Sequence, residues 1–194
     1  MIKFDFDIYK IIQIVNYLLE RNGGSMNYTK LLKLLYIADK EFLKKWDFTI
    51  TQDKYCSMGS GPVLSETYDL ISNKNKKENL QTQWNCLFTT IGYELTLLHK
   101  KNNLPIDRLS RAEKEILDAI YKKHKDHDFN RMIAITHDKI LFPEVKWEEA
   151  QKENASIDLP IEDILRSLNR TPEEIATLDA EITSQQKEAL SLLS

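Results

Sequence analysis

The 194 residues are enough to bury a hydrophobic core, and 42% apolar and 29% charged residues are ordinary proportions for a globular protein. No apolar run approaches the roughly 20 residues of a transmembrane helix, and Asp5 and Asp7 do not fit a secretory signal peptide, so we expect a cytoplasmic protein without a membrane segment. The net charge of −3 argues against strong non-specific binding to nucleic acid, which requires a basic surface.

Charge is distributed unevenly along the chain. From Ala155 to the C terminus, eight acidic and three basic residues give a net charge of −5, so the first 154 residues carry +2. Such asymmetry is typical of a body with an attached tail. We therefore expect one domain over residues 1–153 and an acidic helical extension over residues 154–194.

Apolar residues three and four positions apart predict a first helix with one buried face. They are Ile8, Ile11, Ile12, Val15, Leu18 and Leu19. Asp5 or Asp7 can cap its start, and Gly23-Gly24 ends it. Ser25 or Asn27 can cap a second helix after this short connection, so the two helices should be neighbours.

The second helix has a wide apolar face and is predicted to lie in the core. Its apolar positions are Leu31, Leu35, Ala38 and Phe42, together with Leu32, Tyr36 and Leu43. We expect Lys33, Lys40 and Lys44 on its solvent side. The two helices have the outline of a helix-turn-helix, but a recognition helix needs exposed polar residues at its N-terminal end. We therefore favour two packed core helices and keep a DNA-binding regulator as an alternative.

The second helix is followed by an extended segment and a tight turn. Phe48, Ile50 and Tyr55 precede Gly59, Gly61 and Pro62, residue types that suit a sharp reversal of the backbone. Another helix then leads through Tyr68 to Ile71.

These segments resemble the Panacea domain, also called the SocA-like domain, of bacterial and phage antitoxins. That family typically shows K-L-x-K-L-L-Y-x-A on its second helix and a G-P-V turn followed by Y-D. The matching residues are Lys30, Leu31, Lys33, Leu34, Leu35, Tyr36 and Ala38 in the first motif, and Gly61, Pro62, Val63, Tyr68 and Asp69 in the second.

The middle of the chain predicts a lysine-rich loop and a β-hairpin. Residues 72–79 contain three lysines and no apolar residue, which indicates a solvated loop and, less favoured, a phosphate-contacting patch. Alternation then predicts two strands joined near Thr90-Ile91-Gly92. The strand residues are Trp84, Cys86 and Phe88, then Tyr93, Leu95 and Leu97. This hairpin should lie against the helices or pair with the stretch near Tyr55. The fold class is therefore mainly α (α+β), with a C-terminal helical extension.

Three histidines have acidic neighbours that suggest a metal site or an acid/base pair. His124 and His127, with neighbouring aspartates, have one spacing of a metal site, but no further ligands converge, so we favour a solvated helix end with a cationic histidine. His137 with Asp138 has the residue types of an acid/base pair but no accompanying nucleophile. Gly-rich phosphate loops, nucleophile elbows, H-E-x-x-H and cysteine-pair metal motifs are all missing from the sequence. We expect no enzyme, no catalytic residue, no metal and no cofactor.

The resemblance extends to the region after the hairpin. The family often has L-S-x-x-E at a helix start, and Ser110 with Glu113 forms such a capping box. It also has T-H followed by W-x-x-A, matched by Thr136, His137, Trp147 and Ala150. The resemblance covers about residues 8–152 and implies that His137 and Trp147 are structural anchors. The interval of residues 138–146 is longer than the family suggests, so partner contacts are expected to differ there.

The acidic extension predicts two helices. A short one follows Pro160, and Thr171-Pro172-Glu173-Glu174 is a strong start signal for a longer one. The apolar stripe of the longer helix comprises Ile175, Leu178, Ile182, Ala189 and Leu193. We expect this helix to dock on its own domain, rather than to pair with a second copy or receive a partner.

The resemblance implies an antitoxin that neutralises a cognate toxin by direct protein-protein binding. Alternatives are a proteolytic adaptor that delivers the toxin to a ClpXP-type protease, or the DNA-binding regulator; a homodimer is also conceivable. Aromatic and methionine side chains concentrate binding energy, so the expected partner-binding residues, exposed beside the turn, are Tyr55, Met58, Pro62, Val63 and Tyr68. Each could equally be an ordinary core or turn residue, and for Tyr68 and Val63 that alternative is at least as strong. The expected structural motif residues are Lys30, Leu34, Tyr36, Gly61, Asp69, His137 and Trp147.

Overall fold

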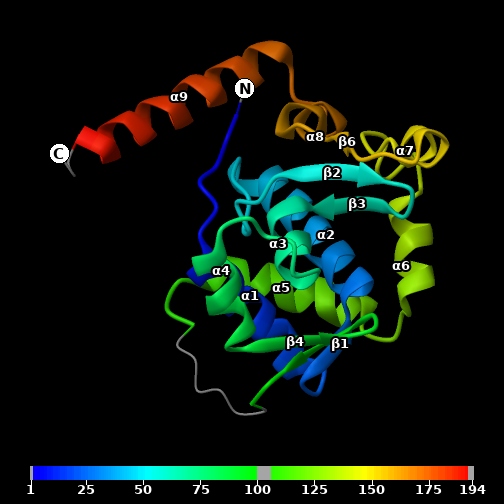
Figure 1. The fold of residues 1–194 in the computed structure, drawn as a ribbon. Coiled ribbons are helices and arrows are strands. Elements are labelled where there is room, and N and C mark those ends of the chain that lie inside the picture. Colours follow the sequence, from blue (N-terminus) through cyan, green and yellow to red (C-terminus); the bar gives the residue numbers. More distant parts are fainter. Residues whose placement is uncertain (1, 100–105, 192–194) are drawn as a thin grey trace.

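A computed structural model of the protein describes residues 2–99 and 106–191, with the side chains of residues 189 and 190 left out. The helices are α1 (Ile8–Arg21), α2 (Tyr28–Trp46), α3 (Ser65–Ile71), α4 (Glu78–Asn85), α5 (Arg111–His124), α6 (Phe129–Thr136), α7 (Trp147–Glu153), α8 (Ile161–Ser167) and α9 (Pro172–Ser191) (Figure 1). The strands are β1 (Ser25–Asn27), β2 (Tyr55–Met58), β3 (Gly61–Leu64), β4 (Phe88–Ile91), β5 (Glu94–Leu97) and β6 (Ile157–Asp158).

The expected α+β class is confirmed, although the chain is less purely helical than anticipated. Among the described residues the strands form two small antiparallel sheets, in the orders β1-β5-β4 and β3-β2-β6, where one hairpin was expected. The second sheet was missed because its strands are only two to four residues long. Runs this short carry almost no alternation signal.

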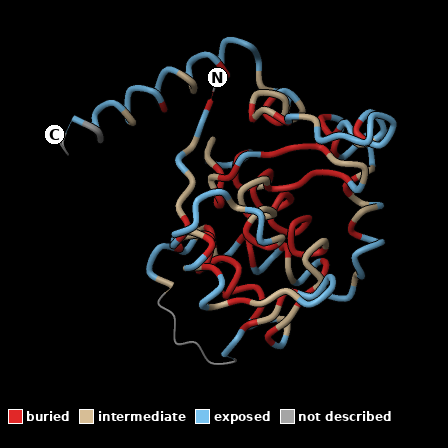
Figure 2. Tube along the Cα trace, in the orientation of Figure 1, coloured by how far each residue is buried: buried red, intermediate tan, exposed pale blue. Residues whose placement is uncertain are grey.

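Helix α2 lies at the centre of the molecule and packs against α5, α6 and β3. Every residue from Lys30 to Lys40 is buried (Figure 2). Lys33 and Lys40 are only 1% and 8% exposed, so the prediction that they lie on the solvent side is wrong. Lys44 is exposed as expected. Because neighbouring elements cover residues 30–40 of α2 on all sides, the buried lysines of this part must find partners inside the protein.

Local signals marked the starts of α1, α2 and α5 correctly. The carboxylate of Asp7 caps α1, the side chain of Asn27 caps α2, and Ser110 forms the predicted capping box with Glu113 at α5. These side chains accept hydrogen bonds from N–H groups that have no partner within the helix. No helix of the described residues is long and apolar enough to cross a membrane.

The predicted hairpin exists, but its first strand starts later than expected. Trp84 lies on α4 and not on a strand; it is 1% exposed, and its ring centroid is 4.4 Å from that of Phe88. The hairpin of β4 and β5 pairs with β1, where Met26 is opposite Leu95, and not with the stretch near Tyr55. The prediction failed here because Trp84, Cys86 and Phe88 alternate with other residues as in a strand, although the helix ends at Asn85 and the strand begins only at Phe88.

The segment after Glu153 is integrated into the body of the protein. Strand β6 pairs with β2, and four apolar side chains that follow it belong to the core: Leu159, Ile161, Ile164 and Leu165. The first part of the expected extension therefore packs against earlier residues, and the domain boundary stays a prediction. Among the described elements, α9 projects beyond the rest of the molecule (Figure 1).

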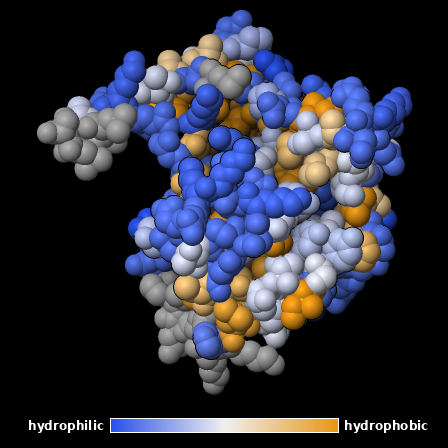
Figure 3. Space-filling view, in the orientation of Figure 1, coloured by the Kyte–Doolittle hydropathy of each residue, from blue (hydrophilic) through white to orange (hydrophobic). Residues whose placement is uncertain are grey.

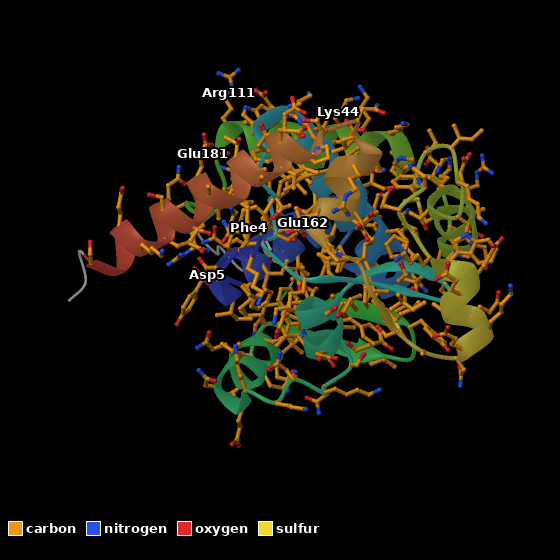
Figure 4. The ribbon with its side chains drawn as sticks, turned by 90° about the horizontal axis from the view of Figure 1, so that it is seen from above. Phe4, Asp5, Lys44, Arg111, Glu162 and Glu181 are labelled. Carbon is orange, nitrogen blue, oxygen red and sulfur yellow. The ribbon has the colours of Figure 1, made fainter. Side chains whose placement is uncertain are left out.

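Helix α9 contacts its own chain, as expected. Ile175 and Ile182 are 7% and 8% exposed, and the Gln186 Nε2 donates a hydrogen bond to the Lys3 carbonyl oxygen at 2.9 Å. Figure 4 shows Phe4 and Glu162 close together beside α9. The N-terminal segment thus lies between α9 and the body. The stripe positions Ala189 and Leu193 lie outside the described side chains.

The buried position of α2 generates a stability prediction. Leu35 on α2 is 0% exposed, whereas Leu141 is 57% exposed. We expect Leu35→Ala to lower the free energy of unfolding by about 2–5 kcal/mol, because it leaves a cavity. Leu141→Ala removes the same atoms from a solvated site and should change stability by no more than about 0.5 kcal/mol. Urea denaturation measures both, and equal losses would contradict the central role of α2.

Candidate functional site

Motif residues from four distant segments meet at the turn between β2 and β3. We call this group the hairpin-turn cluster: Lys33, Gly61, Pro62, His137 and Trp147. The Lys33 Nζ donates a hydrogen bond to the Pro62 carbonyl oxygen at 2.7 Å, and the ring of His137 lies on that of Trp147 with centroids 4.1 Å apart. Helices α2, α6 and α7 therefore hold the turn from three sides.

Lys33 is a buried amine beneath the turn. Burial lowers its pKa from the usual 10.5 to about 7, while the neighbouring Cys56 acts in the opposite direction. The carbonyl of Pro62 is itself buried, and without a donor it would lose the hydrogen bond that compensates its desolvation. Lys33 thus fastens β3 to the central helix.

Gly61 is required by geometry. Its φ is +94°, a conformation that side chains rarely adopt, and a Cβ there would lie 2.9 Å from the Thr136 Oγ1 and 3.2 Å from the His137 Cδ2. The turn can therefore approach the end of α6 only because this position carries no side chain. The glycine of the sequence motif and its histidine are two sides of one contact.

His137 and Trp147 form a flat stack with an interplanar angle of 1°. Burial, and then the nearby Lys33, lower the pKa of His137, whereas a hydrogen bond with the Ser60 backbone and the charge of Glu148 raise it. The Asp138 carboxylate is directed to the loop that follows it and not to the His137 ring. It accepts hydrogen bonds from the N–H groups of Ile140 and Leu141 at 2.8 and 3.2 Å. The stacking places His137 against Trp147, and their role as structural anchors stays a prediction.

The loop of residues 138–146 is anchored from below by α2. The Glu144 carboxylate accepts hydrogen bonds from the Tyr36 hydroxyl at 2.6 Å and from the Lys40 Nζ at 2.8 Å, and Lys40 also donates to the Leu141 carbonyl oxygen at 2.9 Å. Glu144 and Lys40 are 7% and 8% exposed. Burial makes such a pair sensitive to the loss of either partner.

The crest of this loop is apolar and open to solvent. Ile140 is 91% exposed and Leu141 is 57% exposed, directly above the buried Lys40 and Glu144 contacts. On the neighbouring helix, the Glu148 carboxylate pairs with the Lys139 Nζ at 2.6 Å. The loop that carries Ile140 and Leu141 joins α6 to α7. Its buried hydrogen bonds to α2 hold these two exposed side chains in place.

Two further buried carboxylates were not foreseen from the sequence. Asp39 accepts hydrogen bonds from the Thr51 N–H at 2.9 Å and the Tyr55 hydroxyl at 2.8 Å, and burial raises its pKa to about 6. Asp53 accepts from the N–H groups of Glu66 and Thr67, both at 2.9 Å, and burial raises its pKa to about 7. Both groups are engaged by donors of their own chain. Their arrangement fits a structural role, Asp53 as a distant cap of α3.

Three of the five expected partner-binding residues lie in the interior. Tyr55 and Val63 are each 5% exposed, and Pro62 is also buried, so the expectation that these side chains are on the surface is wrong. Several elements cover this small sheet, because β3 packs against α2 and α6 and β2 packs against α7. Met58 is half-buried beside the turn, and Tyr68 is half-buried on another part of the surface.

The remaining motif residues have structural contacts. Lys30 donates to the Lys125 carbonyl oxygen at 2.6 Å, Leu34 and Tyr36 are buried in the core, and Asp69 is half-buried. Lys30 and Lys33 would have to be exposed on a recognition helix. Their burial speaks against the helix-turn-helix alternative.

The pair of His124 and His127 differs from the expected solvated helix end. Their Nδ1 atoms are 3.1 Å apart, and His124 is only 3% exposed. Burial lowers the pKa of His124 to about 4, so it is neutral and not cationic at pH 7. Within residues 2–99 and 106–191, no three or more histidine, cysteine, aspartate or glutamate side chains converge as metal ligands do.

Gly61 allows a test of the turn geometry. We expect Gly61→Ala to lower the free energy of unfolding by about 2–4 kcal/mol, because it combines backbone strain with a clash. Gly23 has a similar φ of +81° but nothing within 4 Å of its Cβ position, so Gly23→Ala should cost only about 1–2 kcal/mol. Chemical denaturation compares the two. Similar losses would show that the contact with Thr136 and His137 is unimportant.

Lys33 generates a prediction of pH dependence. Its pKa is about 7 when folded and 10.5 when unfolded, so between these values only the unfolded chain holds the proton. The free energy of unfolding should therefore gain a rising contribution as the pH increases from about 7 towards 10.5. Lys33→Met removes this contribution. Urea denaturation across that pH range measures the difference between the two proteins, and parallel curves would contradict it.

Comparison with known proteins agrees with this arrangement. The family model described as antitoxin SocA-like, Panacea domain, matches residues 31–140, which is more than half of the chain and contains α2, the G-P-V turn and His137. Neither the curated proteins nor the solved structures yielded a match. The matched segment includes four of the five residues of the hairpin-turn cluster, and Trp147 follows it. The chain therefore belongs to the SocA-like family of antitoxins and carries its Panacea domain.

Proposed function

We propose that this antitoxin neutralises a cognate protein toxin by direct binding, using a contact surface made of Met58, His137, Ile140, Leu141 and Trp147. The observation that carries the proposal is the exposed pair of Ile140 and Leu141 on a loop whose base is buried and charge-paired. Exposed neighbouring aliphatic side chains are unfavourable in water and favourable in an interface.

The rigidity of the base supports binding. A surface that is already ordered loses little conformational entropy when a partner docks, so more of the contact energy appears as affinity. The Lys40–Glu144 pair and the Tyr36 hydroxyl hold the loop, and the buried Phe142 ring lies 6.1 Å from that of Tyr36. Complete burial of one leucine or isoleucine side chain contributes about 1.5–3 kcal/mol. Two such side chains can account for a substantial share of a protein-protein affinity.

The polar groups near this surface support a role in binding over a role in catalysis. Lys33, Asp39 and Glu144 are each engaged by partners of the same chain, and none is left to act on a substrate. His137 is stacked on Trp147 and its pKa is lowered by burial. The half-buried stack of His137 and Trp147 offers an aromatic border for an apolar contact.

The first experiment identifies the partner. The reading frame next to this one should encode a protein that stops growth when expressed alone and is harmless when this chain is co-expressed. Purified together, the two proteins should form a complex that survives gel filtration. Rescue without a complex would argue against direct neutralisation.

The contact surface is tested by a charge placed at its crest. Ile140→Asp should weaken toxin binding by at least about tenfold, equivalent to about 1.4 kcal/mol, because it puts a carboxylate into an apolar contact. Ile91 is also strongly exposed, at 75%, but belongs to β4, so Ile91→Asp is a matched control that should bind normally. Isothermal titration and growth rescue measure the effect, with circular dichroism to check the fold. Full activity of Ile140→Asp would remove this surface from the proposal.

A further inference from the structure

Helix α6 forms part of the rim of the molecule, and none of the other described elements lies outside it (Figure 1). It packs inward against α2 and β3, and its buried residues are Met132 and Thr136, both 0% exposed. Residues four apart lie on the same side of a helix, so these two mark the inward side. The flanks and the outer side of α6 therefore remain available for a partner.

One flank of α6 carries a row of three side chains, which we call the α6 ridge: Phe129, Ile133 and His137. Each follows the previous one by four residues, the spacing that places side chains in line along a helix. His137 continues the row because its backbone still has right-handed helical angles. Phe129 is 40% exposed, and Ile133 and His137 are half-buried. Ile135, by contrast, lies on the opposite flank and packs against the core.

The α6 ridge continues into the surface that we propose for the toxin. His137 belongs to both, and the chain then reaches Ile140 and Leu141, which are 91% and 57% exposed. The eight residues of α6 extend the surface by about 12 Å. Figure 3 shows apolar surface over α6, at the right of the view, bordered by hydrophilic residues. The apolar area offered to one partner is therefore larger than the crest alone.

The charges around the α6 ridge are balanced. The exposed charged residues between positions 128 and 148 are Asp128, Arg131, Asp138, Lys139, Lys146 and Glu148. These are three carboxylates and three cations, and Lys139 and Glu148 already form an ion pair at 2.6 Å. The nearby Lys30 is buried and donates to a backbone carbonyl. Phosphate groups therefore gain no favourable field here, and apolar contact is what this surface offers to a partner.

The spacing of the α6 ridge favours a helix as the element that covers it. A row of side chains at every fourth residue fits into the groove between two rows of another helix, with the two axes about 8–10 Å apart. The backbone groups of a helix, apart from those at its ends, are hydrogen-bonded within it, so a partner strand finds no edge to pair with. A helix with one apolar face can instead cover Phe129 and Ile133 by side-chain contact.

We propose that the cognate toxin places one amphipathic helix along α6, with its apolar face on the α6 ridge and one end against Ile140 and Leu141. The inference rests on the proposed function and names the element of the toxin that this surface receives. Membership of an antitoxin family implies a toxin as partner, and the ridge is continuous with the surface proposed for that toxin. The toxin helix should carry apolar residues at intervals of three and four along one face.

Matched alanine variants test the α6 ridge. Ile133→Ala and Ile135→Ala remove the same atoms from the two flanks of α6, and alanine favours the helix in both. Ile133→Ala combined with Phe129→Ala should weaken toxin binding by at least about tenfold, whereas Ile135→Ala should bind within about twofold of the native chain. Isothermal titration with the product of the neighbouring reading frame measures binding, and circular dichroism checks the fold. Equal binding by the variants of the two flanks would overturn the inference.

A photo-cross-link identifies the toxin segment. Benzoylphenylalanine in place of Phe129 should cross-link to the toxin in the complex, whereas the same group in place of Tyr93, which is 67% exposed between β4 and β5, should not. Mass spectrometry of the product should give a segment with apolar residues three and four apart, and a segment without that spacing would overturn the inference.

The two proposals fail in different ways. Normal binding by the ridge variants, together with weakened binding by Ile140→Asp, would overturn the helix inference and leave the proposed function intact. Absence of any complex with the native chain would overturn both.

Discussion

The structure depends on the enclosure of α2. A helix covered on all sides has no solvent face, so each of its polar side chains must find a partner inside the protein or lose hydrogen-bonding energy. Lys33 reaches the Pro62 carbonyl, Asp39 reaches Thr51 and Tyr55, and Lys40 reaches Glu144. Each contact ties a different outer segment to the same helix.

These contacts explain why an assembly rich in buried charges nevertheless fits a binding protein. The charges lie beneath the surface and position what is exposed: the turn between β2 and β3, and the crest of residues 138–146. A partner would meet Ile140 and Leu141 on a firm support, with His137 and Trp147 at the border. Membership of the SocA-like antitoxin family implies a toxin partner in general, and the contacts give the proposed surface a physical basis.

Much of the fold followed from local pattern. The caps at Asp7 and Asn27 and the capping box at Ser110 were read correctly, because they depend on residues within one helical turn. The candidate site was predicted only in part. Gly61, His137 and Trp147 were named, but their mutual contact was not. The wide apolar circumference of α2 is a signal that Lys33 has no solvent to face, since apolar neighbours surround it.

The sequence by itself determined the starts of α1, α2, α5 and α9, the apolar faces, the tight turn and the family, since each rests on neighbouring residues or on a motif read along the chain. Only the tertiary structure decided which lysines are buried, that β1 and not the stretch near Tyr55 pairs with the hairpin, and that β6 joins β2. Those outcomes depend on contacts between segments far apart in the sequence. An example is the pairing of β2 with β6, next to which the Leu159 N–H donates a hydrogen bond to the Tyr55 carbonyl oxygen. Local periodicity contains no information about which distant surface will cover a given face.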